Sequence, residues 1–85
     1  MRLVYLVVGT TGEYSDREEW PVRAYLLEAN AVRHRDAAEA AAATIHRERE
    51  DRYSVPHGVN PHDPDMKMDY TGTHYEIWMA ELGDE

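Results

Sequence analysis

The sequence lacks cysteine, has no long apolar run and contains a single Lys or Arg after residue 52. Without cysteine, the chain has no disulfide framework, no thiolate metal site and no cysteine nucleophile. Its longest apolar run, LVYLVV, has six residues, whereas a membrane-spanning helix needs roughly 20. The same run is too short for the apolar region of a signal peptide. We therefore expect a cytoplasmic protein with no membrane association.

Negative charge is concentrated in two parts of the chain. The formal net charge is −8, with four acids and one arginine in residues 13–19, and seven acids against Lys67 in residues 53–85. Such a chain is repelled by the phosphates of nucleic acids and attracted by a basic protein or ribonucleoprotein complex. We therefore expect a basic partner and no direct nucleic-acid binding. The alternative is that the acidity only keeps a small domain in solution.

At 85 residues, the chain has the length of one small domain, residues 1–85. A domain of this size buries only about 60 to 65% of its unfolded surface, so oligomerisation is a common supplement to its stability. The sequence contains no P-loop, dinucleotide fingerprint, zinc-finger spacing or nucleophile elbow. These features favour a non-enzymatic binding module that needs no cofactor.

Two strands are predicted near the start of the chain. Residues 3–8 are apolar on both faces of an alternating strand, which is typical of a central strand. Residues 20–27 form the second predicted strand, in which Pro21 is compatible with the first position or with a sheet edge. The alternation places Val22, Ala24 and Leu26 on one face and Arg23 and Tyr25 on the other.

One long helix and a last strand complete the predicted elements. Residues 28–52 form the helix, with Ala31, Ala38, Ala42 and Ile45 on one face. Residues 54–69 are rich in proline and predict a loop, and residues 70–82 alternate as a third strand. The order β-β-α-β predicts an α+β fold, a three-stranded antiparallel sheet of order 2-1-3 with the helix packed on one face.

The helix covers only one face of the predicted sheet. We expect Tyr5, Tyr25 and Trp78 on the uncovered face, where an aromatic patch would favour a homodimer or a partner surface. The alternative is that the loop of residues 54–69 folds back over that face. A self-associating structural or regulatory protein therefore remains a further functional hypothesis.

The turn TTGEYSDREEW is the first candidate site. Ser15 with Glu18, and Asp16 with Glu19, have the spacing of capping boxes, which predicts one helical turn before Trp20. The acids disfavour a phosphate cradle, and so small a fold leaves little room for a paired-carboxylate active site. We expect a partner-binding surface instead. Its candidate residues are Glu13, Asp16, Glu18 and Glu19, with Tyr14 and Trp20 as aromatic anchors and Asp63, Asp65 and Asp69 as a second acidic set.

Histidines in the predicted loop offer an alternative function. His57, His62, Asp63 and Asp65 lie within nine residues, HGVNPHDPD, and imidazole and carboxylate are ligands for zinc or manganese. The spacing matches no established metal motif. A metal-dependent hydrolase or nuclease is therefore the alternative hypothesis to a binding module.

The run YLVVGTTGEYSDREEWPVRAYL, followed by an alanine-rich helix and DYTGTHYEIWMAEL, resembles small bacteriophage and prophage proteins with a GEYSD-like turn. The resemblance covers residues 3–52 and 69–82. It implies the same β-β-α-β layout and supplies no catalytic residues. It further implies an inhibitor of host defence, such as an anti-CRISPR protein, which would act in the host cytoplasm. Some proteins of that class present carboxylates to a Cas protein where phosphates would bind.

Overall fold

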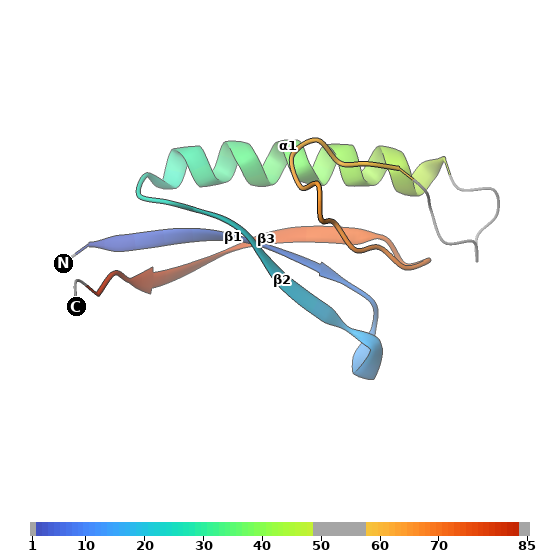
Figure 1. The fold of residues 1–85 in the computed structure, drawn as a ribbon, viewed down its shortest axis with the longest axis horizontal. Helices are drawn as coiled ribbons and strands as arrows, with labels where there is room; N and C mark the ends of the chain where they lie inside the picture. The colour runs from blue at the N-terminus through green and yellow to red at the C-terminus, as the bar shows by residue number, and fades with distance from the viewer. Residues whose placement is uncertain (1, 49–57, 84–85) are drawn as a thin grey trace.

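The apolar run at the start of the chain forms the central strand of the sheet. The structure, a computed structural model, describes residues 2–48 and 58–83. In chain order its elements are β1 (Leu3–Thr11), a short 3-10 helix (Tyr14–Asp16), β2 (Glu18–Tyr25), α1 (Glu28–Arg47) and β3 (Thr73–Glu81). The sheet is antiparallel with order β2-β1-β3, and α1 lies along one side of it (Figure 1). The predicted α+β fold and strand order are confirmed.

A β-bulge in β2 changes which side chains face the helix. Val7 pairs with Arg23 and Val8 pairs with Pro21, so Val22 has no partner of its own on β1. The extra residue breaks the period of two. Val22 and Tyr25 therefore both pack against the core, and the predicted separation of these two side chains onto opposite faces is wrong. Pro21 lies on the edge strand, as its missing N–H requires.

The core lies between α1 and the sheet. Ala31, Ala38 and Ala42 are buried on one face of the helix, as the spacing predicts, and they pack with Val7 and Tyr75. Because alanine is small, the larger apolar surface comes from the strands and from the segment that precedes β3. The helix ends at Arg47, and residues 49–52 of the predicted helix lie outside the described residues.

The segment before β3 packs on the helix side of the sheet. Met66 and Met68 lie against the core cluster, and the Asn60 side-chain amide donates to the Ala38 carbonyl at 3.0 Å. Figure 1 shows this segment beside α1. The alternative that the loop covers the other face is therefore wrong for its described part, residues 58–69. Residues 70–72, predicted as strand, form a turn before β3 begins at Thr73.

No described helix or strand packs on the opposite face of the sheet, although Val8, which alternates onto that face, is only 1% exposed. Tyr5 and Tyr25 pack against the core on the helix side, which corrects their predicted place on the uncovered face. Trp78 does lie on the uncovered face, because it alternates with Ile77 of the core, and 46% of its surface is exposed. Within residues 2–48 and 58–83, no helix combines the length and apolar character needed to cross a membrane.

Candidate functional site

The turn between β1 and β2 carries the first acidic set. Glu13, Asp16, Glu18 and Glu19 are all exposed, and with the other residues of 12–19 they form what we call the acidic tip. Figure 1 shows this turn at the end of the sheet opposite the chain termini. The predicted capping boxes are absent: Glu13 precedes the 3-10 helix, and no side chain caps it.

Two exposed cations partly balance these acids. Arg17 lies 3.0 Å from a Glu19 carboxylate oxygen and 4.0 Å from Glu76, and the Lys67 ammonium lies 3.5 Å from Glu18. All of these side chains are more than a third exposed, so each pair contributes little to stability. Glu13 and Asp16 lie in the same turn and are exposed.

Tyr14 has an unusual backbone conformation at the acidic tip. Its φ is 53°, and 94% of its surface is exposed. A left-handed conformation costs about 1 to 2 kcal/mol for a residue with a Cβ, and strained residues of this kind cluster at functional sites. A large aromatic side chain that gains almost no burial does not offset that cost within the fold. Tyr14 is therefore the feature of the acidic tip that folding alone does not explain.

A turn before β3 holds the base of the acidic tip. The Thr11 hydroxyl donates to the Gly72 carbonyl at 2.6 Å and accepts from the Asp69 backbone N–H at 3.0 Å. The Gly12 N–H donates to the Thr71 hydroxyl at 3.3 Å. Burial alone would raise the pKa of Asp69, but hydrogen bonds from Thr71 and Thr11 outweigh it and hold the pKa below its ordinary value. Asp69 thus anchors the acidic tip to the segment before β3.

Asp63 and Trp20 lie inside the protein instead of on a binding surface. Asp63 is 3% exposed, and one of its carboxylate oxygens accepts from the Trp20 indole N–H at 2.9 Å and from the Tyr75 hydroxyl at 2.8 Å. Trp20 is 9% exposed. Burial and the neighbouring Asp63 carboxylate raise the pKa of Tyr75 well above its ordinary value. The predicted roles of Asp63 and Trp20 as exposed partner-binding residues are therefore wrong.

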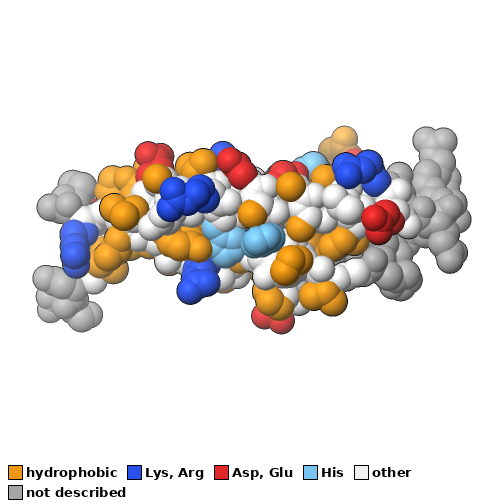
Figure 2. Space-filling model, turned by 90° about the horizontal axis from the view of Figure 1, so that it is seen from above, with side chains coloured by type: hydrophobic (Ala, Val, Ile, Leu, Met, Phe, Trp, Pro, Cys, Tyr) orange, Lys and Arg blue, Asp and Glu red, His pale blue; other side chains and the backbone are white. Residues whose placement is uncertain are grey.

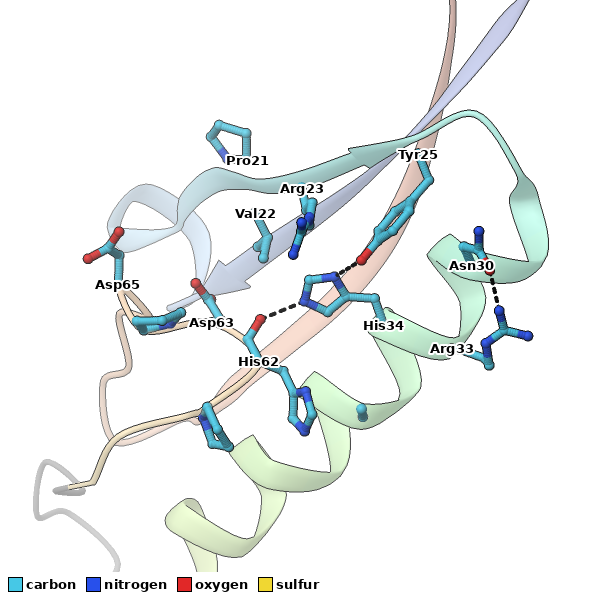
Figure 3. Close-up of a pocket in the computed structure, with 13 residues that line it drawn as sticks. Pro21, Val22, Arg23, Tyr25, Asn30, Arg33, His34, His62, Asp63 and Asp65 are labelled. Carbon is cyan, nitrogen blue, oxygen red and sulfur yellow. Dashed lines mark hydrogen bonds between the residues drawn. The ribbon is translucent and has the colours of Figure 1, made fainter.

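A shallow groove separates β2 from the N-terminal half of α1. Its volume is about 630 Å³, and the segment 61–65 closes its third side (Figure 3). His34 lies at its centre: its Nε2 is 2.6 Å from the His62 carbonyl oxygen, and its Nδ1 is 2.7 Å from the Tyr25 hydroxyl. Since a carbonyl only accepts, Nε2 carries a proton. His34 thus joins the helix to both β2 and the loop through its two ring nitrogens.

The described part of the chain does not bring the candidate metal ligands together. His57 lies outside the described residues. The Asp63 carboxylate is buried and hydrogen-bonded, whereas His62 and Asp65 are exposed. Among the described residues, no three His, Asp or Glu side chains lie together where they could hold a metal ion.

The helix side of the molecule carries mixed charges. Figure 2 shows arginine, acidic and histidine side chains interspersed with apolar ones over this face, with no extended area of one sign. Asp65, an exposed member of the second acidic set, lines the groove. On the face that Figure 2 shows, the acidic side chains therefore form no extended surface of one sign.

Three residues with structural consequences were missed in the sequence. The Glu39 carboxylate accepts from the backbone N–H of Tyr75 at 2.8 Å and lies 2.9 Å from His74 Nδ1, so it occupies the outer edge of β3. Asn60 and His34 fasten the loop to α1. Of these three residues, only Glu39 left a signal in the sequence. It is an acid in the middle of an alanine run, and a solvent-facing position on a helix does not require one.

Comparison of the chain with protein-family models, with curated proteins and with solved structures finds no match.

Proposed function

We propose that this chain is a small, non-enzymatic protein-binding module whose acidic tip docks on a basic surface of a nucleic-acid-binding partner. The observation that supports it most is Tyr14, a fully presented aromatic side chain in a strained conformation, surrounded by exposed Glu13, Asp16, Glu18 and Glu19. Aromatic anchors within a charged rim are typical of binding hot spots.

The rigidity of the acidic tip favours this function. Gly12 has a φ of 89°, and a Cβ there would collide with the Asp16 carbonyl oxygen, so the turn is tightly closed. The hydrogen bonds of Thr11 and Gly12 to the segment 69–72 fix the base of the turn. A pre-organised binding element loses less conformational entropy on docking than a mobile one.

The most specific form of the proposal is an inhibitor of a host-defence complex. The likeness of the GEYSD turn to phage proteins favours a CRISPR–Cas complex as the partner and the cytoplasm of a host cell as the location. In this form, the carboxylates of the acidic tip occupy positions at which nucleic-acid phosphates would otherwise bind. Tyr14 would stack on an exposed apolar or cationic side chain within that basic surface.

Charge reversal within the acidic tip tests the proposal. The Glu18→Lys/Glu19→Lys variant should slow association with a purified, guide-loaded Cas effector complex and flatten the salt dependence of the association rate. The control is Glu28→Lys/Glu81→Lys, which makes the same change in net charge at the opposite end of the molecule. Equal rates and equal salt dependence for the two double variants would refute a binding role for the acidic tip.

Replacement of Tyr14 separates binding from folding. Tyr14→Gly should increase the free energy of unfolding by about 1 kcal/mol, because glycine adopts a positive φ without strain. The same variant should bind the effector complex more weakly, because the aromatic anchor is gone. Urea denaturation and surface plasmon resonance measure the two effects. A variant that is stabilised and binds normally would remove Tyr14 from the proposed contact.

A further inference from the structure

The groove between β2 and α1 has walls that are joined to one another. His34 connects α1 to β2, because one of its ring nitrogens lies 2.7 Å from the Tyr25 hydroxyl. Its other ring nitrogen lies 2.6 Å from the His62 carbonyl oxygen, which belongs to the segment 61–65. Asp63 fastens the same segment to the core, because its buried carboxylate accepts hydrogen bonds from two buried side chains. The groove is therefore preformed, and its volume of about 630 Å³ lies within the roughly 300 to 1,000 Å³ that is typical of small-molecule sites.

Two arginines that line this groove have no carboxylate partner in the described structure. Arg23 of β2 lies over the Tyr25 ring, with its guanidinium carbon 5.9 Å from the ring centroid. Arg33 of α1 donates to the side-chain carbonyl of Asn30. Among residues 2–48 and 58–83, neither arginine forms an ion pair, whereas three other Lys or Arg side chains do. In a chain with 17 acidic residues against nine Lys and Arg, two arginines without a carboxylate in one groove indicate a site for an anion.

The charges of the groove are separated along its length. Figure 3 shows Arg33 at one end, Asp65 towards the other end and Arg23 between them. The second carboxylate that lines the groove, Asp63, is 3% exposed and already accepts two hydrogen bonds. The part of the groove between Arg23 and Arg33 therefore carries two positive charges, and no exposed carboxylate lines it.

We propose that the groove binds a phosphate monoester with a planar aromatic body, of the class of the mononucleotides. The phosphate fits the part of the groove between Arg23 and Arg33, because a phosphate monoester carries close to two negative charges at neutral pH. Guanidinium groups also form paired hydrogen bonds with phosphate oxygens. A carboxylate carries one negative charge, which a single arginine balances. The two arginines therefore favour a phosphate over a carboxylate.

The rest of the groove suits the aromatic body of such a ligand. Its apolar walls come from five residues, which are Pro21, Val22, Ala37, Pro61 and Pro64. The exposed His62 ring adds a flat aromatic surface on which a nucleobase can stack. Asp65, towards the end away from Arg33, can accept a hydrogen bond from an exocyclic amino group. A nucleobase that carries such a group, as in AMP, is therefore complementary to this part of the groove.

This ligand site is separate from the acidic tip. No residue of the acidic tip lines the groove. The proposed ligand depends on the arginines and the apolar walls of the groove, and it does not require that the chain binds a basic partner. The two proposals can therefore fail separately.

Isothermal titration calorimetry of the full chain with AMP tests the proposal. We expect saturable binding in the micromolar to millimolar range. Adenosine lacks the phosphate, inorganic phosphate lacks the aromatic body, and benzoate replaces the phosphate by a carboxylate. Each of these three probes should bind about tenfold more weakly than AMP, or weaker still, because each loses one of the two kinds of contact.

Two substitutions in the groove provide the matched variants. Arg23→Gln and Arg33→Gln should each weaken AMP binding about tenfold or more, because each removes one charged hydrogen-bond donor. Arg47→Gln makes the same change in net charge at the other end of α1 and should leave AMP binding unchanged. All three side chains are exposed, so thermal unfolding should show that the variants remain folded.

Amide NMR spectra of the nitrogen-labelled wild-type chain locate the site without any substitution. AMP should shift the amide signals of residues 22–25 and 62–65 and leave those of the acidic tip unchanged. Shifts in these segments, together with weakened binding in both groove variants only, would support the proposal. Shifts confined to other segments would overturn it.

The absence of saturable binding at millimolar AMP would also overturn the proposal. Adenosine or benzoate that binds as tightly as AMP would overturn the recognition of phosphate. Equal weakening in Arg47→Gln and in the two groove variants would overturn the site as well, because net charge alone would then explain the effect. Arg23→Gln should bind a guide-loaded Cas effector complex as the wild type does, so the outcome of that measurement concerns the acidic tip alone.

Discussion

Tyr75→Phe tests the buried hydrogen-bond network around Asp63. The substitution removes one hydroxyl from a side chain that is 6% exposed. That hydroxyl donates to the Asp63 carboxylate at 2.8 Å and accepts from the Asn60 amide at 3.3 Å, while Asn60 keeps its bond to the Ala38 carbonyl. A hydrogen bond to a charged group contributes about 1.5 to 3 kcal/mol, so we expect the variant to lose about 2 kcal/mol of stability at neutral pH.

The pH dependence of this loss is distinctive. The pKa of Tyr75 is raised in the folded protein, so the unfolded chain gives up the phenolic proton first, near its ordinary pKa of 10.0. The stabilisation is fully present below pH 10 and is lost as the pH rises above it. At pH 11 the wild type should have lost about 1 kcal/mol through this group, and Tyr75→Phe loses none. The difference in stability between the two proteins should therefore shrink to about half of its value at neutral pH.

Urea denaturation at pH 7 and pH 11, followed by circular dichroism, measures this difference. Tyr14→Phe is the matched control, because its hydroxyl belongs to a side chain that is 94% exposed, and its stability should equal that of the wild type. The reasoning would be refuted by a Tyr75→Phe variant as stable as the wild type at pH 7. A loss that stays constant up to pH 11 would equally contradict it.

The other expected outcomes concern the base of the acidic tip and the close contact of β1 with Trp20. Asp69→Asn should lower the free energy of unfolding by about 1 kcal/mol at neutral pH. Because the pKa of Asp69 is lowered in the folded protein, this stabilisation is present above pH 3.8 and is lost in acid, so the difference from the wild type should vanish well below pH 3.8. Urea denaturation at neutral pH and in acid would test this, and a loss of stability that does not depend on pH would contradict it. Gly9→Ala would place a Cβ 2.6 Å from the Trp20 indole and should cost about 1 to 3 kcal/mol in thermal or urea unfolding. Gly83→Ala is its control, since a Cβ there meets nothing within 4 Å, and equal losses at both glycines would contradict the close packing.

The strand order and the helix face were predictable because they depend on local patterns. The apolar run of β1 requires two neighbouring strands, and the spacing of Ala31, Ala38 and Ala42 fixes the buried side of α1. The bulge at Val22 was not predictable from alternation, since it is defined by the pairing of β2 with β1. That single extra residue moved Tyr25 to the helix side.

The candidate site was predictable only in its local part. The exposed acids of the acidic tip follow from sequence composition, whereas the left-handed backbone of Tyr14 depends on how the turn closes. From the sequence, Asp63 is predicted to be an exposed acid in a proline-rich loop. Its burial depends on two donors distant in sequence, the Trp20 indole and the Tyr75 hydroxyl, which the fold brings to one carboxylate oxygen. Hydrogen bonds between residues that are distant in sequence leave no local pattern from which the burial of Asp63 could be predicted.

An order-of-addition binding experiment tests the proposed function most directly. A guide-loaded Cas effector complex is incubated with target DNA before or after addition of the wild-type chain, and bound chain is quantified. The proposal predicts that DNA added first blocks the chain and that the chain added first blocks DNA, with both effects lost in Glu18→Lys/Glu19→Lys and retained in Glu28→Lys/Glu81→Lys. Simultaneous binding of DNA and chain, or equal blocking by both double variants, would contradict it.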